Sequence, residues 1–259
     1  MIINLNGEIL DQTTAKIPAA SPAFLNGFGI FETLRTYNQK LFHPEEHLQR
    51  LSQSARAIGL VLKWIPKRLQ KELEKTLSLS DNPESHARVV VTQDDLIIYV
   101  KPLKEKPEYY YCQGVELVSY AGHRSMPSVK KIGDLLCFLA NQHAKARGAY
   151  EAVLVDPLKY VHECAYANIF WADGGELYTT RKEILFGITR DIVIRLAGEC
   201  FYMDVSYRNL LLADEVFITQ TSSGILPVVA IDGQRIGNGK PGSMTSELMK
   251  KFNALVWKS

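Results

Sequence analysis

Hydrophobic positions in the first hundred residues follow the period of strands in some segments and that of helices in others. Asn6-Gly7 predicts a hairpin turn within residues 2–10, because both residues tolerate the positive φ angles of a type I′ turn. A helix is predicted from about Pro44, since apolar residues recur there at steps of three and four. The other expected elements are strands at 29–36, 40–42, 87–91 and 96–100 and a helix through Leu69, Leu73 and Leu77.

A polar segment with two prolines, residues 101–108, interrupts this pattern and predicts a domain boundary. We expect an N-terminal domain at 1–107, an interdomain linker at 108–114 and a C-terminal domain at 115–259. The C-terminal elements expected are helices at 132–147 (closed by Gly148), at 190–200 and from Thr245, strands at 115–120, 151–155, 160–163, 169–171, 176–179 and 215–219, and a hairpin at Asp232-Gly233. Short strands in hairpins between helices indicate a mixed α+β fold.

Composition places the chain among ordinary globular proteins. It is 46% hydrophobic and 22% charged, and 30 basic against 28 acidic residues leave a net charge of +2. This balance argues against disorder and against a nucleic-acid partner. The sequence shows neither an apolar run long enough for a membrane span nor a signal peptide. Four scattered cysteines predict no metal site, free thiols and a cytoplasmic location.

Several local motifs carry candidate chemistry, and each also has an ordinary structural interpretation. Residues 187–190 lead into a predicted helix whose first N–H groups could bind an anion, although Thr189 alone is better interpreted as a helix N-cap. Residues 221–224 are a hydroxyl-rich turn that fits an anion site or a plain loop equally well. Arg50 on its helix would by default be solvated, and Glu163 at the end of a strand would by default be structural.

The order and spacing of these motifs resemble those of the class IV aminotransferase family, the fold-type IV enzymes that use pyridoxal 5′-phosphate (PLP). The similarity covers nearly the whole chain and rests on residues 27–33, 46–51, Lys130, 163–170, 187–190, 213–217, Thr221 and 227–233. It implies a two-domain fold like that of D-amino acid aminotransferase, with a small N-terminal α/β domain and a larger C-terminal mixed α+β domain.

The resemblance also implies roles for individual residues. Lys130 and Lys131 both stand at a predicted helix start. Lys130, and not Lys131, would form the Schiff base with PLP, because the register from Lys130 to Leu135 matches the family pattern. Glu163 would pair with the pyridine nitrogen and keep it protonated. The other expected cofactor-binding residues are Arg50, Ile188, Thr189 and Thr221 at the phosphate, and Gln220 beside them.

Three activities compete within the family. The chain is short, residues 163–171 carry a cysteine and alanines, and Leu135 stands where branched-chain enzymes have a tyrosine. These features favour aminodeoxychorismate lyase, which eliminates pyruvate from 4-amino-4-deoxychorismate and gives p-aminobenzoate for folate synthesis. The alternatives are an aminotransferase of D-amino or branched-chain amino acids, or a non-catalytic PLP- or small-ligand-binding protein. The loops at Ser21-Pro22 and 92–95 depart from the family pattern and leave the substrate open.

Two further expectations concern support and assembly. Arg124, which precedes Lys130 by six positions, is expected to support the lysine loop rather than to bind a substrate carboxylate. The resemblance implies a homodimer acting on a small-molecule substrate, with no nucleic-acid or membrane partner. The terminal helix and the aromatic residues, 10% of the chain, could supply the apolar interface.

Overall fold

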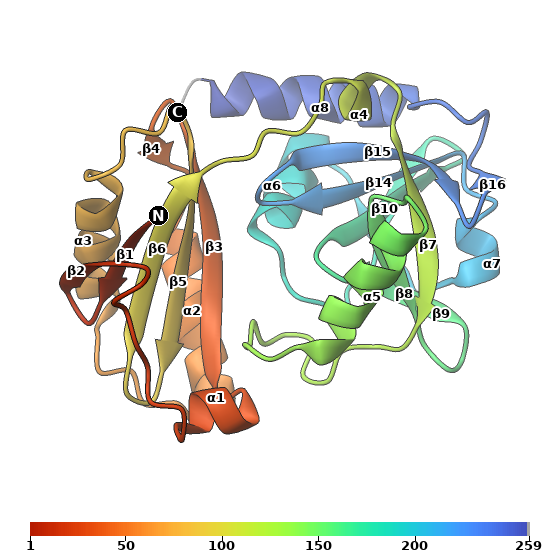
Figure 1. Ribbon diagram of the computed structural model, residues 1–259. Coiled ribbons are helices and arrows are strands. Elements are labelled where there is room, and N and C mark those ends of the chain that lie inside the picture. Colours follow the sequence, from red (N-terminus) through yellow and green to blue (C-terminus); the bar gives the residue numbers. More distant parts are fainter. Residues whose placement is uncertain (258–259) are drawn as a thin grey trace. The chain divides into compact units, whose positions relative to one another are not determined.

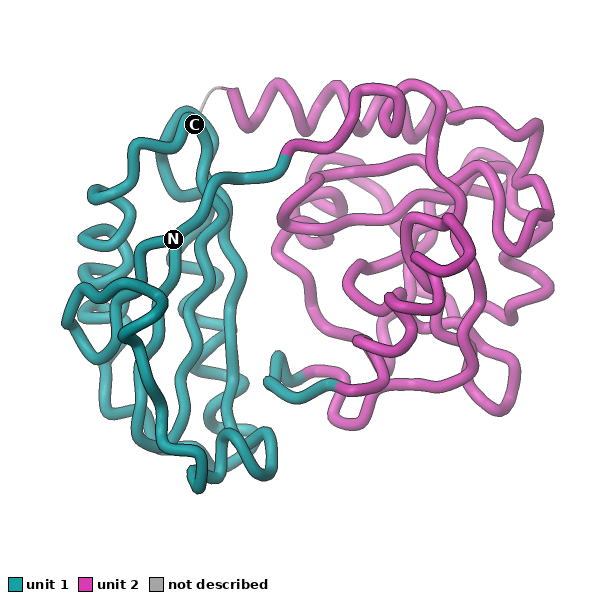
Figure 2. Tube along the Cα trace, viewed as in Figure 1, with its two compact units in different colours: residues 1–104, 129–134, 259 teal, residues 105–128, 135–258 magenta. Residues whose placement is uncertain are grey.

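The computed structural model describes residues 1–257, which divide into two compact units (Figures 1 and 2). The first unit contains Met1–Lys104 and Val129–Asp134, and the second contains Glu105–Ser128 and the described residues from Leu135 onward. This division differs from the boundaries expected from the sequence, because it gives residues 129–134 to the first unit. Those boundaries stay a prediction about which segments fold independently, since spatial contacts do not measure independent folding.

The described part of the first unit is a six-stranded antiparallel sheet in the order β2-β1-β6-β5-β3-β4. Its strands are β1 (Ile2–Leu5), β2 (Glu8–Asp11), β3 (Gly29–Tyr37), β4 (Lys40–Leu41), β5 (Ser85–Thr92) and β6 (Leu96–Pro102), and its helices are α1 (Pro22–Asn26), α2 (Pro44–Ala57) and α3 (Pro66–Leu77). The predicted hairpin is confirmed, with positive φ at both turn residues, and so are the two longer helices.

Side-chain alternation along β3 defines the two faces of this sheet. Ile30, Glu32 and Leu34 are fully buried on the side that α2 and α3 cover, whereas the residues between them are only partly buried (Figure 1). Both helices begin with a proline, which suits the first helical position because the N–H that it lacks would have no partner there. Burial of the apolar stripe of each helix against one face of the sheet forms the core of this unit.

The second unit, over its described residues, is built on a ten-stranded mixed sheet in the order β12-β11-β10-β14-β15-β7-β8-β9-β13, with β16 paired to β15. Its strands are β7 (Val115–Ala121), β8 (Glu151–Val155), β9 (Tyr160–Cys164), β10 (Asn168–Asp173), β11 (Glu176–Thr179), β12 (Phe201–Tyr202), β13 (Val205–Ser206), β14 (Glu215–Gln220), β15 (Gly224–Ile231) and β16 (Gln234–Arg235). Its helices are α4 (Tyr109–Cys112), α5 (Leu135–Ala146), α6 (Ile188–Ala197), α7 (Tyr207–Leu210) and α8 (Ser243–Val256).

Three helices cover parts of this sheet. Helix α5 packs on β7 and β8, while α8 packs on β14 and β15 and also contacts α6 (Figure 1). The strands β7 and β8 are parallel, and α5 is the crossover between them. The fold is therefore the mixed α+β arrangement that hairpins interspersed with helices predicted.

The helix expected at 132–147 begins later than predicted, at Leu135. Lys131 forms an isolated bridge with Ile30 of β3, and irregular backbone separates it from the helix, so Lys130 and Lys131 do not stand at a helix start. The end of the helix was predicted correctly, since Gly148 follows it with φ +71°.

Helix α6 begins at Ile188, two residues before the predicted start, and its N-cap residue is Gly187. The interpretation of Thr189 as the N-cap is therefore wrong, because this residue lies inside the first turn.

Several short elements had no signal in the sequence. Helices α1, α4 and α7 and strands β12 and β13 are only two to five residues long, which is too short to display a period. Helix α4 occupies the segment expected to be a linker. Strand β15 is one arm of the hairpin predicted at Asp232-Gly233, which its antiparallel pairing with β16 confirms, but the rest of the strand is almost continuously buried and shows no alternation.

Within the described range, every helix is too short or too polar to span a bilayer. The same residues contain no cluster of three or more metal-binding side chains. All four cysteines are free thiols. The cytoplasmic location stays a prediction from the sequence.

Glu151, the first residue of β8, is a carboxyl group buried in the second unit. Its side chain accepts a hydrogen bond from the N–H of Ala152 at 3.0 Å, and the residue is only 2% exposed. Burial raises the pKa of Glu151 to about 7, although the backbone N–H groups of Ala152 and Tyr166 act in the opposite direction. The folded protein therefore keeps a proton on this group at pH values where the unfolded chain has lost it.

We expect Glu151→Gln to raise the thermal unfolding midpoint at pH 8 by about 5 °C and to raise it by much less at pH 5. The folded pKa lies above the unfolded value of about 4.3, so the wild-type protein loses stability as the pH rises from about 4 to 7. Glutamine resembles the protonated carboxyl group and removes this loss. Calorimetry at both pH values measures the effect, with exposed Glu116→Gln as the control. An equal shift at the two pH values would contradict the prediction.

Candidate functional site

Residues 129–134 belong to the first unit and are joined to β3 by an isolated bridge between Lys131 and Ile30. The carbonyl of Lys130 accepts the N–H of Phe31 at 2.9 Å, and the N–H of Ile132 donates to the carbonyl of Gly29 at 3.0 Å. Val129 is 2% exposed and belongs to the core of this unit. The main chain at Lys130 is therefore held by the buried side chain of Val129 and by the backbone hydrogen bonds to β3.

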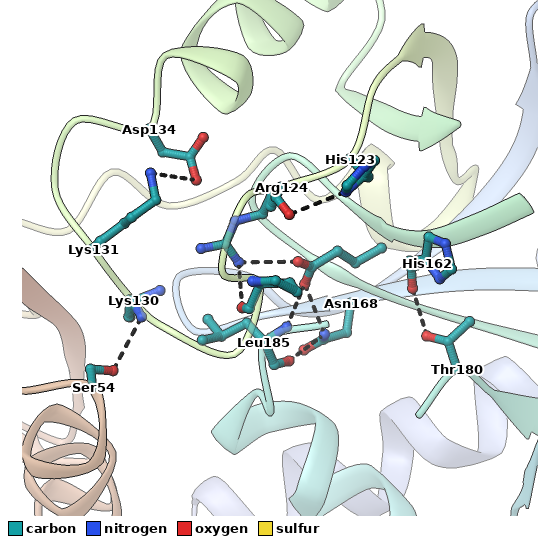
Figure 3. Close-up of polar contacts among 12 residues, drawn as sticks. Ser54, His123, Arg124, Lys130, Lys131, Asp134, His162, Asn168, Thr180 and Leu185 are labelled. Carbon is teal, nitrogen blue, oxygen red and sulfur yellow. Dashed lines mark hydrogen bonds and ion pairs between the residues drawn. The ribbon is translucent and has the colours of Figure 1, made fainter. Parts of the chain in front are cut away.

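The two neighbouring lysines have different surroundings. The Nζ atom of Lys130 lies 4.9 Å from the centroid of the Phe31 ring, and the guanidinium of Arg88 lies 3.8 Å from the same centroid. The Nζ atom of Lys131 instead lies 3.9 Å from a carboxylate oxygen of Asp134 (Figure 3). The Lys131 side chain thus lies near a carboxylate, whereas the Lys130 amine lies over an aromatic ring.

Arg50 belongs to a buried ionic cluster in the first unit, so the default interpretation of a solvated side chain is wrong. Its Nε and Nη2 atoms donate to the two carboxylate oxygens of Glu32, each at 2.7 Å, and Nδ1 of His47 lies 2.8 Å from one of them. The exposed fractions are 7% for Arg50, 0% for Glu32 and 1% for His47.

The charges of this cluster depend on one another. Burial alone would raise the pKa of Glu32, but Arg50 and His47 hold it well below its ordinary range. Burial lowers the pKa of His47 in spite of the adjacent carboxylate. The guanidinium is thus oriented by a bidentate carboxylate from β3, an arrangement that gives Arg50 a fixed direction.

Glu163 is the centre of a second buried group, in the second unit. Its carboxylate accepts hydrogen bonds from Nη1 of Arg124 at 3.0 Å, from the N–H of Leu185 at 3.0 Å and from Nδ2 of Asn168 at 3.4 Å (Figure 3). Arg124 also donates to the carbonyl of Pro127 at 3.1 Å. Arg124 therefore ties Glu163 to the segment that precedes Lys130, which agrees with the expected supporting role.

The start of α6 lies against this second group. Nδ2 of Asn168 donates to the carbonyl of Leu185 at 2.7 Å, and a Cβ added at Gly187 would lie 2.1 Å from Oδ1 of Asn168. Only glycine fits at this N-cap, and no side chain caps the helix. The first N–H groups of α6, at Ile188 and Thr189, are therefore available to an anion.

Gln220 organises the hydroxyl-rich turn between β14 and β15. Its Oε1 atom accepts hydrogen bonds from the hydroxyls of Tyr150 at 3.1 Å, Ser222 at 3.2 Å and Ser223 at 3.0 Å, and its Nε2 atom donates to the carbonyl of Tyr166 at 3.3 Å. These bonds engage both the oxygen and the nitrogen of the Gln220 amide, and they brace the turn that carries Thr221. A cofactor contact through Gln220 stays a prediction.

The structure thus brings the expected site residues together in two groups. Arg50 and Lys130 belong to the first unit, where Ser54 on the same helix as Arg50 accepts the N–H of Lys130 at 3.1 Å (Figure 3). The second unit holds the other expected residues, Glu163, Ile188, Thr189, Gln220 and Thr221. Asn168 pairs opposite Thr219 across β10 and β14, which places the 221 turn at the same end of the sheet as Asn168.

Sequence reasoning missed the residues that orient this chemistry, although signals for them exist. His47 and Ser54 stand three and four positions from Arg50, so they share the buried face of its helix. Glu32 alternates with Ile30 and Leu34, which marks it as an inward carboxylate that needs a buried partner. Asn168 lies in the 163–170 motif that carries the resemblance, but nothing in the sequence indicated its bond to Glu163.

Comparison with known proteins identifies the family. The profile described as Amino-transferase class IV matches residues 29–231. The chain belongs to the class IV aminotransferase family. Its relatives include a putative branched-chain-amino-acid aminotransferase of Methanocaldococcus jannaschii, 31% identical over 97% of this chain and 95% of that protein. A D-alanine aminotransferase of Bacillus licheniformis is 30% identical over 96% of this chain and 94% of that protein.

Solved structures give the same fold. A T.th. branched-chain amino acid aminotransferase with pyridoxamine 5′-phosphate has a TM-score of 0.92 and 25% identity, over 100% of this chain and 95% of that one. A branched-chain aminotransferase from Thermoproteus uzoniensis with norvaline has a TM-score of 0.89 and 28% identity, over 100% and 95%. The protein is accordingly a PLP-dependent enzyme of fold type IV.

The residues described above fit this cofactor. An aldehyde calls for a primary amine, a pyridine nitrogen for a buried carboxylate, and a phosphate for a guanidinium and unpaired N–H groups. Lys130, Glu163, Arg50 and the uncapped start of α6 are groups of these kinds, and their role at the cofactor stays a prediction. The glycine at the N-cap of α6, where a side chain has no room, leaves the N–H groups exposed to a ligand instead of to a capping residue.

Proposed function

We propose that the protein is an aminotransferase that moves the amino group of a branched-chain or D-amino acid to a 2-oxo acid. The observation that carries this proposal is that aminotransferases match this chain at 30% identity or more along nearly their whole length. The sequence favoured the lyase among the family's activities, whereas the named relatives favour the aminotransferase that was its alternative.

Lys130 is the proposed catalytic residue. Its primary amine would be the group that holds the cofactor through the aldehyde, and when released it would move the proton at the substrate α-carbon. PLP, when bound, withdraws electrons from the carbon that loses its proton. Glu163 would hold a proton on the pyridine nitrogen, and Arg124 with Asn168 holds that carboxylate in place.

Three features of the fold suit the cofactor's phosphate. Arg50 is oriented by Glu32, the first N–H groups of α6 carry the positive end of the helix dipole, and Thr221 lies in the turn that Gln220 braces. We propose that these groups bind the phosphate.

The face of the first sheet opposite α2 and α3 favours a substrate with a carboxylate. On β3, β5 and β6 this face carries Arg35, Arg88, His86 and Lys101 and no acidic residue in the described chain. Burial first, and then the charge of Lys101, lowers the pKa of His86 to about 4. The positive charges of Arg35, Arg88 and Lys101 on this face would attract an anion such as the carboxylate of an amino acid.

We expect Lys130→Ala to reduce aminotransferase activity by about a thousandfold, because it removes the group that forms the cofactor bond and moves the proton. Reduction of the PLP-treated wild-type protein with borohydride, followed by peptide mass analysis, should place the cofactor on Lys130. Lys131→Ala is the matched control and should retain both activity and labelling. The reverse pattern would show that Lys131 is the catalytic lysine.

The substrate assay separates the remaining activities. We expect keto-acid formation from L-leucine, L-valine or D-alanine with 2-oxoglutarate, because the relatives named for these substrates match the whole chain. Aminodeoxychorismate is offered in parallel. Formation of p-aminobenzoate without a keto acid would establish the lyase and reject the aminotransferase. Neither product, with a wild-type protein that binds PLP, would support the non-catalytic binding protein.

We also propose that the protein is a homodimer. Helix α5 presents Leu135, Phe138 and Leu139 on one face, 64%, 53% and 45% exposed, which is a large apolar surface for a helix. The terminal helix α8 buries Leu248 and Phe252 within its own unit, and a contribution of its remaining surface to the interface stays a prediction.

The double substitution Phe138→Glu and Leu139→Glu should convert a dimer to a monomer in sedimentation velocity, because it places charges in the apolar face. The exposed substitution Lys145→Glu on the same helix is the control and should leave the dimer intact. A wild-type protein that sediments as a monomer would refute the proposal.

A further inference from the structure

We propose that Ser54 is a positioning residue that fixes the backbone of Lys130 through the hydrogen bond between its Oγ atom and the Lys130 N–H. This inference rests on the role proposed for Lys130 above. Ser54 is 1% exposed on α2, and the bond is 3.1 Å long (Figure 3). It joins residues that are far apart in the sequence.

The hydrogen bond of the Ser54 hydroxyl differs in kind from that of a nearby serine on the same helix. A helical serine commonly donates to the carbonyl one turn earlier, as Ser52 does to Leu48 at 2.9 Å. Ser54 instead accepts a bond from a separate segment of the chain. Its oxygen gives the Lys130 N–H a partner in a place where an unpaired N–H would be costly.

The sequence around β3 is adapted to the close approach of the lysine segment. Gly27 and Gly133 have φ values of +65° and +70°, and a Cβ added at Gly133 would lie 3.1 Å from the Cα of Gly27. A Cβ at Gly29 would lie 2.9 Å from Cδ1 of Ile132 and 3.0 Å from the carbonyl of Val91. The Gly27-Phe28-Gly29 motif therefore lets the two backbones meet closely enough to pair.

The bond completes a clamp on the lysine. The carbonyl of Lys130 is held by Phe31 on β3, and its N–H is held by Ser54 on α2. Both ends of the residue are thus fixed by elements of one unit, so the side chain starts from a set position and direction. Ser54 also stands one turn after Arg50, so one helix face orients the guanidinium and the lysine backbone together.

Fixing the backbone matters because the lysine side chain is long and flexible. Each unfixed torsion spreads the amine over more positions, and a small misplacement of a reacting group reduces the rate strongly. Loss of the clamp should therefore lower kcat and leave the KM for the amino donor unchanged, because Ser54 is proposed to touch only the Lys130 backbone.

The first readout uses the protein without cofactor. Hydrogen exchange at the Lys130 amide, measured by NMR on protein labelled with ¹⁵N-lysine, should be about tenfold faster in Ser54→Ala than in the wild type. Exchange at Lys67, Lys71 and Lys75, which lie on α3, should not change. Ser52→Ala is the matched control and should leave the Lys130 amide as in the wild type. A general loosening of the unit would accelerate the α3 lysines as well.

The second readout uses the PLP-loaded enzyme, in which Ser54→Ala should lower kcat about tenfold at unchanged KM while Ser52→Ala changes neither. An unaltered Lys130 amide in Ser54→Ala, or an equal effect of Ser52→Ala, would overturn the proposal. Failure of the proposed function shows differently, as a wild-type protein that borohydride does not label at Lys130. In that case the exchange experiment still decides whether Ser54 fixes the backbone.

Discussion

The pairing of residues 129–134 with β3 is the interaction on which the rest of the described chemistry depends. The chain leaves the second unit at Ser128 and returns to it at Leu135, and between these points it is bonded to the first. Buried Val129 and backbone hydrogen bonds, each worth about 1 kcal/mol, hold the segment. Main-chain hydrogen bonds fix the backbone position of a catalytic lysine in this segment. These bonds would form whatever side chain the residue carried.

Charge is the second constraint, because both groups of site residues bury ions. A buried carboxylate is tolerated only where partners replace its water, and Glu32 and Glu163 each have an arginine. These pairs do more than neutralise charge. Glu32 gives Arg50 a direction, and Arg124 gives one to Glu163, so each group that would meet the cofactor is held by a second residue that would not. The hydroxyl-rich turn follows the same rule, with Gln220 as its brace.

Different parts of the molecule indicate its family and its substrate. The match to the class IV aminotransferase profile covers residues 29–231, and the residues proposed to bind PLP lie within this range. The basic face of β3, β5 and β6 favours a substrate that carries a carboxylate as well as an amine. An amino acid and aminodeoxychorismate both meet this requirement, so the face does not distinguish between them. Activity therefore follows from the pocket surrounding the lysine and not from the lysine itself, because one amine can complete either reaction.

The sequence by itself determined the elements with a clear period and the motifs with a fixed order. The apolar stripes of α2 and α3, the Asn6-Gly7 turn and the glycine after α5 are local signals, and the series from Gly27 to Thr221 was specific enough for the family. Tertiary structure alone decided the rest. The bridge of Lys131 to β3 has no period and depends on a strand about a hundred positions away, so the sequence predicted that Lys130 and Lys131 stand at the start of a helix. The burial of Arg50 was hidden for the same reason, since its carboxylate partner stands on another element and only folding removes both from water.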